Sequence, residues 1–418
     1  MKKIILIIAL SLLYLIVYSQ DTIKVMSYNL LNYGNYTSYC TTSNNNVSEK
    51  NEYLKTIIDY ALPDILGVVE ISPEDTYIDG LKNNVLNQNG RNYYAKAPKS
   101  NYSGSSIINM LYYDSRKLTL SFWTSLATTY RDINIYTFYF KNDALENGDT
   151  VYLTCIVMHL KAGNTDSDAS DRTAMAQTLM NFLNNFNENT NYLVMGDFNV
   201  YSSSEGAYQQ LTNFSNANIR FYDFINKYGD WSNNAYFSPY HSQSTHTTSD
   251  CFSGGGLDDR FDFILGNINT ITGAKGFKYL ADSYTTLGQD GQHFNKGLLD
   301  SPTNSTVPSD VLEALYGNSD HLPIIAKFIV DNTISVNDYS LPINYYMIDN
   351  KLYINFINPS FTDMSIKILD VQGRQVYTDQ ISSDIQQYIL DMNNYNKGVY
   401  LIDIYNNTGF TSFKILNF

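Results

Sequence analysis

Polar residues stand directly beside apolar runs at six places along this chain, and their side chains are of the kinds that hydrolytic sites use. They are Asn29, Glu70, His159, the pair Asp197 and Asn199, Asp262, and the pair Asp320 and His321. Taken singly, an Asn or Asp beside a strand is usually a turn or cap residue, and a lone His is usually a core or loop residue. Together they offer carboxylate and amide oxygens, the ligands that Mg²⁺, Mn²⁺ or Ca²⁺ accept more readily than zinc. Histidines beside carboxylates and a hard cation are equipment for hydrolysing a phosphate ester.

Alternating strands and helices must bring these residues together. Thr22–Tyr28 alternates with period two and predicts a strand, and the apolar spacing after Ser48 predicts a helix that Ser48 caps and Pro63 ends. A second helix is predicted after Ser170, and further apolar strands are predicted over Ile65–Val69, Val151–Met158, Tyr192–Met195, Phe261–Leu265 and Leu322–Val330. Because loops at strand ends in an α/β fold share one rim, we expect the polar residues to form one site.

The composition limits how a polyanion could be bound. The 418 residues include 27 Lys and Arg and 41 Asp and Glu, which gives a formal net charge of −14. A bulk electrostatic grip on nucleic acid or on an anionic membrane is therefore excluded as the main binding principle. A metal ion or a few placed cations must meet such a ligand locally.

The N-terminus predicts export. Met1–Lys3 is basic, Ile4–Tyr18 is apolar apart from Ser11, and a signal peptide over residues 1–19 would be cleaved after Ser19. The apolar run is short for a membrane span, although an uncleaved anchor stays open as the alternative, and no later segment offers a span. We expect the mature protein to be soluble, exported and without stable membrane insertion.

Three cysteines are too few for a disulfide scaffold, and their spacing matches no zinc site. Cys40 and Cys251 lie in polar, loop-like sequence and form the better candidate pair. Cys155 lies in an apolar run, where a buried free thiol is expected.

The residue pattern of the chain changes after Val330. Residues 332–340 have the composition of a linker, and short alternating runs separated by turn residues fill residues 341–418 without any helical period. This pattern predicts a small all-β sandwich that follows a large α/β domain over residues 20–331.

Six segments of the large domain resemble, in order, the motifs of the endonuclease/exonuclease/phosphatase (deoxyribonuclease I-like) superfamily. They are SYNLLNY (Ser27–Tyr33), DILGVVEI (Asp64–Ile71), VMHLKAG (Val157–Gly163), GDFN (Gly196–Asn199), RFDFIL (Arg260–Leu265) and SDHLPI (Ser319–Ile324). The resemblance implies a four-layered α/β sandwich with two central, mostly antiparallel sheets. The strand and helix pattern alone leaves a parallel doubly wound sheet equally open.

The resemblance also implies a metal site. Asn29, Glu70 and Asp320 would hold Mg²⁺ or Mn²⁺, with an accessory Ca²⁺ as a further option. Val69 stands where the family commonly has a polar Gln, which affects a contact behind the ligand rather than the ligand itself.

Catalytic roles carry over in the same way. Asp197 would orient or deprotonate the attacking water, and Asn199 would bind the scissile phosphate. His321 would act as general acid/base or stabilise the phosphorane, with Asp262 orienting its ring. His159 would touch a phosphate oxygen or protonate the leaving group, and which group is the base stays open.

The C-terminal domain resembles the type A sorting domain of the type IX secretion system, on the segments Ile366–Val376 and Asn396–Phe410. It ends in Asn417–Phe418, where the family usually closes on a basic residue. The resemblance implies export to the cell surface or the medium through the type IX machinery. A carbohydrate-binding or adhesive sandwich stays open as the alternative.

These observations favour a secreted, monomeric, divalent-metal-dependent phosphodiesterase, most simply a nuclease that hydrolyses extracellular DNA or RNA. The alternatives are a sphingomyelinase-like phospholipase C, for whose membrane-docking hairpin Phe138–Phe140 and Tyr236–Tyr240 are poor candidates, and a non-catalytic adhesin.

Other polar side chains give weaker expectations. Lys161 and Arg172 are expected on solvated faces or at a helix start rather than on flanking phosphates, Asn109 on a solvent-facing strand position rather than in the cleft, and the remaining histidines at the surface, namely His241, His246 and His293.

Overall fold

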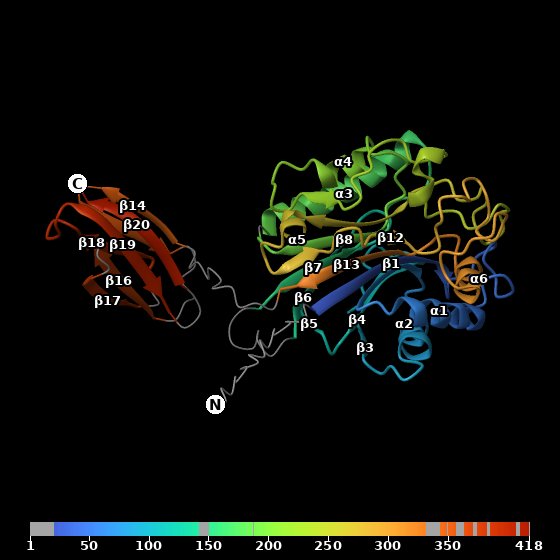
Figure 1. Cartoon of the computed structure of the whole chain (residues 1–418), viewed down its shortest axis with the longest axis horizontal. Helices are drawn as coiled ribbons and strands as arrows, with labels where there is room; N and C mark the ends of the chain where they lie inside the picture. Colours follow the sequence, from blue (N-terminus) through green and yellow to red (C-terminus); the bar gives the residue numbers. More distant parts are fainter. Residues whose placement is uncertain are drawn as a thin grey trace, which may run out of the picture. The chain divides into compact units, whose positions relative to one another are not determined.

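The computed structural model describes residues 21–141, 150–186, 188–331, 343–348, 350–356, 363–370, 374–382, 385–406 and 410–417. Contacts divide the chain into two compact units, residues 1–333 and 334–418 (Figure 1). The expected signal peptide over residues 1–19 and the expected linker over residues 332–340 lie outside the described residues. Within these ranges, no helix combines the length and the apolar character needed to cross a membrane.

The first unit contains a seven-stranded sheet in the order β11-β13-β1-β2-β4-β3, with β12 paired to β13. All its pairs are antiparallel except β1 with β2. Its strands are β1 Asp21–Tyr33, β2 Ile65–Ile71, β3 Tyr94–Lys96, β4 Ile108–Asp114, β11 Phe277–Tyr279, β12 Thr285–Thr286 and β13 Ile324–Val330.

A second sheet has six strands in the order β5-β6-β7-β8-β10-β9, and only β7 and β8 are parallel. The strands are β5 Leu118–Leu126, β6 Ile133–Phe140, β7 Tyr152–Val157, β8 Asn191–Asp197, β9 Phe221–Asp223 and β10 Asp262–Asn267. Two mostly antiparallel sheets confirm the fold that the resemblance implied and exclude the parallel doubly wound sheet.

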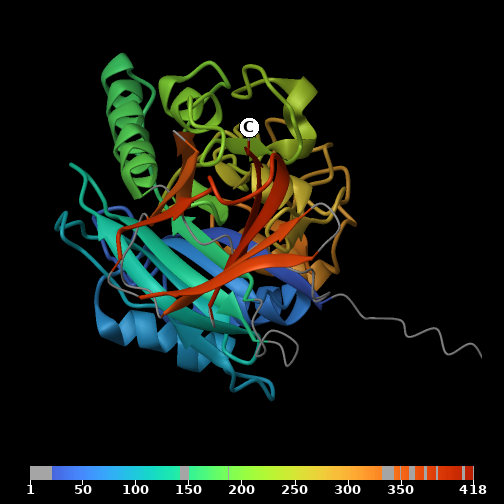
Figure 2. The same ribbon diagram turned by 90° about the vertical axis from the view of Figure 1, so that its left-hand side faces the viewer.

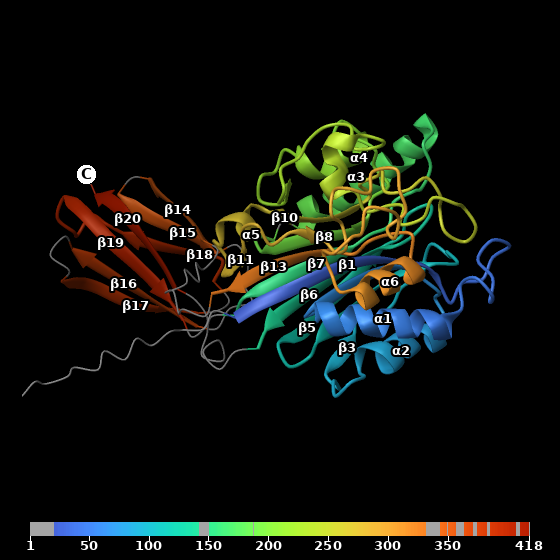
Figure 3. The same ribbon diagram turned by 45° about the vertical axis from the view of Figure 1, so that its right-hand side comes forward.

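Helices cover the outer face of each sheet, which gives four layers (Figures 1 and 3). Beside the first sheet lie α1 Val47–Ala61, α2 Asp75–Leu81, the π-helical turn η1 Lys82–Leu86 and α6 Ser309–Asn318. Beside the second sheet lie α3 Asp166–Phe186 and α4 Gly206–Thr212, on the opposite side of the strands (Figure 2). The short elements η3 Ala235–Tyr240 and α5 Ile268–Thr272 complete the described helices of this unit.

The core between the two sheets is apolar and closely packed. Val25 and Leu111 from the first sheet pack in one cluster with Phe138, Cys155 and Met195 from the second, and all five are fully buried. Burial of each large apolar side chain contributes roughly 1.5–3 kcal/mol, so this layer anchors the strand ends on which the polar residues stand.

Several element ends differ from the prediction. The cap of α1 is Asn46 rather than Ser48, because the Asn46 side chain accepts from the backbone N–H of Ser48 and Glu49. Helix α3 begins at Asp166, before the predicted start, and β1 runs on to Tyr33. The first turn of a helix and the bulged end of a strand contain polar residues, so the spacing of apolar residues does not mark these boundaries.

The cysteines behave as predicted. Cys40 and Cys251 form a disulfide across a sequence separation of 211 residues, and Cys155 is a buried free thiol in β7. The disulfide joins two long irregular segments, residues 35–46 and 241–257, and the second of them contacts predicted site residues.

The second unit is all-β in its described residues. One sheet contains β14 Ile343–Ile348, β15 Lys351–Phe356 and β18 Gln387–Asp391. The other has the order β17-β16-β19-β20, formed by β16 Met364–Asp370, β17 Gln375–Ile381, β19 Gly398–Tyr405 and β20 Phe410–Asn417. Leu352 and Ile354 of the first sheet share a buried cluster with Ile366 and Ile402 of the second, which confirms the predicted sandwich.

Candidate active site

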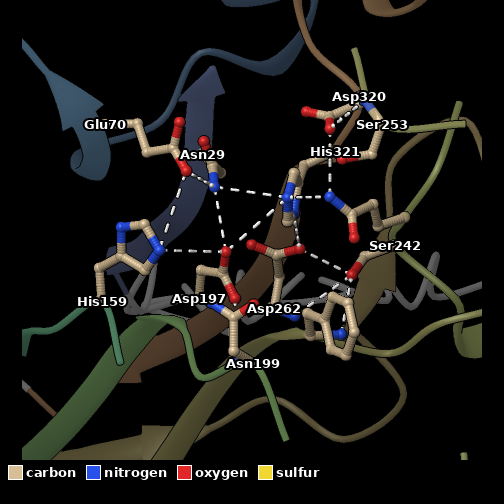
Figure 4. Close-up of polar contacts among 12 residues, drawn as sticks. Asn29, Glu70, His159, Asp197, Asn199, Ser242, Ser253, Asp262, Asp320 and His321 are labelled. Atoms are coloured by element: carbon tan, nitrogen blue, oxygen red, sulfur yellow. Dashed lines mark hydrogen bonds and ion pairs between the residues drawn. The ribbon is translucent and has the colours of Figure 1, made fainter. Parts of the chain in front are cut away.

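The ends of four strands meet where the two sheets adjoin, and the predicted residues gather there (Figure 4). Asn29 lies in β1 and Glu70 in β2 of the first sheet, while Asp197 ends β8 and Asp262 begins β10 of the second. The other predicted residues lie close to strand ends: His159 follows β7, Asn199 follows β8, and Asp320 and His321 precede β13. Apart from Glu70, which is partly exposed, every one of these side chains is buried.

Irregular backbone aims two of these side chains. Glu70 has φ +61°, and the pairing of β2 with β4 shifts register between Val68 and Ile71. Asn199 has φ +50°, directly after the end of β8. Positive φ at non-glycine residues is costly, and bulges of this kind redirect side chains beside functional sites.

Gly196 lets His159 lie against Asp197. Its φ is +137°, and a Cβ at this position would come within 1.9 Å of the carbonyl oxygen of Met158. The approach is fixed on both sides of His159, since Met158 N–H donates to Met195 O at 3.0 Å and Leu160 N–H donates to Asp197 O at 2.9 Å. Any larger residue would push the histidine away from the carboxylate.

The Asn29 amide occupies the centre of the cluster. Its Nδ2 lies 3.1 Å from Glu70 Oε1, 3.0 Å from Asp197 Oδ2 and 3.4 Å from His321 Nε2 (Figure 4). Its Oδ1 accepts from Leu31 N–H at 2.9 Å. One neutral side chain therefore holds two carboxylates from different sheets at close range.

His321 is oriented by a buried carboxylate. Its Nδ1 lies 2.7 Å from Asp262 Oδ2, which also accepts from Ser242 Oγ at 2.7 Å. Burial alone would lower the pKa of His321, but the carboxylates of Asp262 and Asp197 outweigh it and hold that pKa well above 6.5. The Gln243 amide nitrogen, 2.7 Å from Nε2, can donate to it only while the ring is uncharged, so protonation of His321 must release this amide N–H to another acceptor.

Asp197 and His159 are shifted toward their neutral forms. Burial, with the Asp262 and Glu70 carboxylates adding to it, raises the pKa of Asp197 to about 7 although His321 and Asn29 oppose the shift. Burial, with Arg131 and His321 adding to it, holds the pKa of His159 well below 6.5. His159 Nε2 lies 3.6 Å from Asp197 Oδ2 and 3.8 Å from Glu70 Oε1, and because the ring is neutral these are polar contacts rather than ion pairs.

The sequence model of the Endonuclease/Exonuclease/phosphatase family matches residues 26–268. The chain belongs to this family. Membership makes it a hydrolase of phosphodiester or phosphate ester bonds. The matched region includes Asn29, Glu70 and Asp262, and the fold adds Asp320 and His321 from beyond its end. A search of the curated proteins found no match.

The chain is also similar to several solved structures at low sequence identity. A family protein from Bacteroides thetaiotaomicron is 14% identical over 75% of this chain and 97% of its own, with a TM-score of 0.46. D. rerio TDP2 in complex with a single-stranded DNA product is 13% identical over 74% and 99%, with a TM-score of 0.45. The human Nocturnin catalytic domain with bound sulfate is 17% identical over 74% and 97%, with a TM-score of 0.43.

Residues 348–417 match the model of the secretion system C-terminal sorting domain, which indicates export.

The cluster offers ligands that fit a divalent cation. Among the described residues, two groups of side chains have ligand atoms within 4.8 Å of one another, namely Glu70 with His159 and Asp197, and Asp197 with Asp262 and His321. Asp320 belongs to neither group, yet its buried Oδ1 has no hydrogen-bond partner. An unpartnered buried carboxylate oxygen is suited to a cation. Asn29 would have to turn its amide to offer oxygen as a ligand, since its nitrogen now faces the carboxylates.

Five contributors to the cluster were not predicted. Ser242 donates to Asp262, Gln243 Nε2 lies 3.1 Å from Asp320 Oδ2, and Ser253 N–H donates to the same oxygen at 2.9 Å. All three lie in a segment without periodicity, so no pattern could single them out. The other two are cations that only the fold brings close, Arg131 and Lys50.

The weaker expectations fare unevenly. Lys161 Nζ pairs with Asp168 Oδ1 at 2.8 Å, as a helix-start residue would. Arg172, in contrast, is 1% exposed, and its guanidinium holds Glu205 and the carbonyl oxygens of Lys161 and Gly163, so the prediction of a solvated face was wrong. Asn109 is buried and donates to Asp132 O and Val157 O rather than facing solvent.

The prediction of surface positions for three histidines was also wrong, since His241, His246 and His293 are all buried. His241 Nε2 lies 2.8 Å from Trp231 O, and His293 Nδ1 lies 2.8 Å from Asp290 Oδ1. His246 stacks between Phe252 and Tyr316. Backbone carbonyls, a carboxylate and aromatic rings thus surround these histidines, and a polar neighbouring sequence does not mean exposure.

Proposed function

We propose that this chain is a secreted, divalent-metal-dependent phosphodiesterase that hydrolyses extracellular DNA or RNA. The observation that carries the proposal is the arrangement of His321, whose Nδ1 is held by Asp262 and whose Nε2 lies 3.7 Å from Asp197 Oδ2. Two titratable groups whose pKa values are both raised, side by side in one buried cluster, are suited to moving a proton.

Asp197 and His321 would divide the proton transfers. Because its pKa is raised to about 7, the Asp197 carboxylate is matched to take a proton from a water molecule at neutral pH. The imidazolium of His321, fixed by Asp262, would offset charge on the phosphate oxygens or protonate the leaving group. The Asn199 amide and the neutral His159 ring would supply uncharged donors to the same phosphate.

Glu70 and Asp320, with Asn29 once its amide has turned, would hold Mg²⁺ or Mn²⁺. Such an ion polarises a phosphoryl oxygen and offsets the charge of the clustered carboxylates. Asp320 Oδ2 is held in place by Ser253 N–H, and its Oδ1 has no hydrogen-bond partner. Glu70 Oε2 is held by Asn32 N–H at 3.1 Å, and its Oε1, which now accepts from Asn29 Nδ2, would face the ion once the Asn29 amide has turned.

Local cations answer the objection raised by the acidic composition. Arg131 Nη1 donates to Leu160 O at 3.2 Å, while its Nε is buried without a partner. Its charge acts on Glu70 and Asp197, so a polyanion entering the site would meet it. A binding mode limited to such placed charges predicts weak, salt-sensitive affinity for nucleic acid.

The second unit would serve export rather than catalysis. Its match to a sorting domain supports a route through the type IX secretion machinery, after a signal peptide over residues 1–19. In this proposal residues 20–331 form the catalytic domain, residues 332–340 a linker, and residues 341–418 the sorting domain.

A substrate panel tests the proposal. The purified chain is incubated with supercoiled plasmid, single-stranded RNA and sphingomyelin vesicles, each with Mg²⁺, Mn²⁺, Ca²⁺ or chelator. Hydrolysis of DNA or RNA that chelator and His321→Ala both abolish supports the proposal. Release of choline phosphate with nucleic acids intact would make the chain a phospholipase C, and no hydrolysis of any substrate would favour the adhesin.

A further inference from the structure

Gln243 contacts His321 Nε2, the ring nitrogen on the side away from Asp262. Its Nε2 lies 2.7 Å from His321 Nε2 and 3.1 Å from Asp320 Oδ2. The neighbouring Ser242 holds the other end of the same pair through Asp262 Oδ2. Two consecutive residues therefore contact both ends of the imidazole–carboxylate pair.

The backbone of Gln243 is fixed from two directions. Gln243 N–H donates to Asp259 O at 3.1 Å, and Asp259 N–H donates to Gln243 O at 2.9 Å. On the other side, Leu322 N–H donates to Ser242 O at 2.7 Å. These contacts tie the residue between the segments that lead into β10 and β13, so only its side chain is free to adjust.

Gln243 is also less buried than its partners. Ser242, Asp262 and His321 are at most 3% exposed, whereas Gln243 is partly exposed. The carboxamide thus lies between the buried pair and the solvent side from which a substrate must come. A phosphate oxygen that reaches His321 Nε2 has to displace the amide or share its hydrogen bonds.

We propose that Gln243 is a substrate-binding residue, whose amide N–H groups pass from His321 and Asp320 to a non-bridging oxygen of the scissile phosphate. This inference rests on the proposed phosphodiesterase function. A primary amide suits the task because it offers two donors without a charge, so it can contact a carboxylate, an imidazole and then an anion. Its fixed backbone keeps these donors within reach of His321 in every state.

Gln243→Met tests the proposal, because methionine keeps the length of the side chain and removes both N–H donors. The matched control is Gln292→Met, at an exposed glutamine of a nearby loop. Losing a hydrogen bond to a charged oxygen should raise KM, and the Kd for inorganic phosphate in the presence of Mg²⁺, by about 10-fold or more. The control should match the wild type, kcat should change less than KM, and the melting temperature of both variants should stay near that of the wild type.

Several results would overturn the proposal. One is a Gln243→Met variant with the KM and phosphate affinity of the wild type. Another is a variant in which only kcat falls, because the amide would then act through His321 and not on the phosphate. If Gln243→Met does not fold, Gln243→Asn takes its place, and its shorter amide should weaken phosphate binding as well. If the wild type hydrolyses no phosphodiester, the proposed function is wrong. Titration with inorganic phosphate then tests the Gln243–phosphate contact separately. Weaker phosphate binding by the variant would still support the contact, whereas no phosphate binding by the wild type would end it.

Discussion

His321 Nδ1 and Asp262 Oδ2 lie 2.7 Å apart although the two residues stand beside strands of different sheets. Asp262 begins β10 of the second sheet, and His321 stands just before β13 of the first. The pair therefore joins the two sheets at the point where the site residues gather. Its geometry depends on the packing of the whole sandwich rather than on any local segment.

Asp262→Asn should lower kcat by about 100-fold, because an amide neither stabilises the imidazolium nor fixes the ring as a carboxylate does. The melting temperature should fall as well, because the imidazolium of His321 loses the buried carboxylate that offsets its charge. Steady-state kinetics and thermal melts check both statements. Asp282→Asn, at an exposed carboxylate, is the control. Equal turnover in the two variants would remove Asp262 from the mechanism.

Asp197 should make the metal-free protein less stable as pH rises. Burial raises its pKa from 3.8 to about 7, so the folded chain keeps a proton that the unfolded chain releases. Stability therefore falls as pH increases from about 4 to 7 and levels off above that window. Asp197→Asn should lose this slope and also lose activity by orders of magnitude. Urea unfolding of both proteins in chelator at three pH values measures the difference, and parallel pH profiles would contradict it.

Divalent cations should raise the melting temperature, because the clustered carboxylates repel one another without an ion. An ion that binds only the folded chain at 100 times its Kd stabilises it by about 2.7 kcal/mol, which is on the order of 5 °C for a domain of this size. Glu70→Gln should reduce this increase strongly, and Glu74→Gln, outside the cluster, should not. An unchanged increase in Glu70→Gln would exclude Glu70 as a ligand.

The Cys40–Cys251 disulfide should strengthen metal binding as well as the fold. Asn32 Nδ2 contacts Cys40 Sγ at 3.6 Å while Asn32 N–H holds Glu70, and Ser253, two residues after Cys251, holds Asp320. Reduction should cost about 2–4 kcal/mol of stability and weaken the metal-induced rise in melting temperature. Calorimetric Mg²⁺ titration of the Cys40→Ser/Cys251→Ser double variant measures the second effect. Unchanged affinity would confine the disulfide to a structural role.

The sequence marked the residues that gather in the cluster better than it marked the residues around them. Residues such as Glu70 and Asp197 stand at abrupt ends of apolar runs, so a local pattern marks them. Gln243 and Arg131 have no such pattern, because contacts distant in sequence bring them to the cluster. The buried His241 has polar neighbours in sequence, and only its carbonyl partners account for its burial.

The arrangement of the sheets shows the same limit. Strand and helix periodicity located most elements, but the direction of neighbouring strands is fixed by pairings across the chain, such as β1 with β13. The mostly antiparallel arrangement of the strands was predicted only from the family resemblance, which rests on the ordered motifs. Positive φ at Glu70 and the close approach at Gly196 are likewise consequences of packing, which no single-residue preference reveals.

Anomalous diffraction from crystals of the full chain soaked in millimolar Mn²⁺ tests most directly whether this cluster is a metal-assisted hydrolytic site. We predict one anomalous peak at roughly 2.0–2.6 Å from a Glu70 carboxylate oxygen, with Asp320 Oδ1 as a further ligand. A map with no peak among these carboxylates, or with manganese bound only elsewhere on the surface, would contradict a metal-dependent phosphodiesterase.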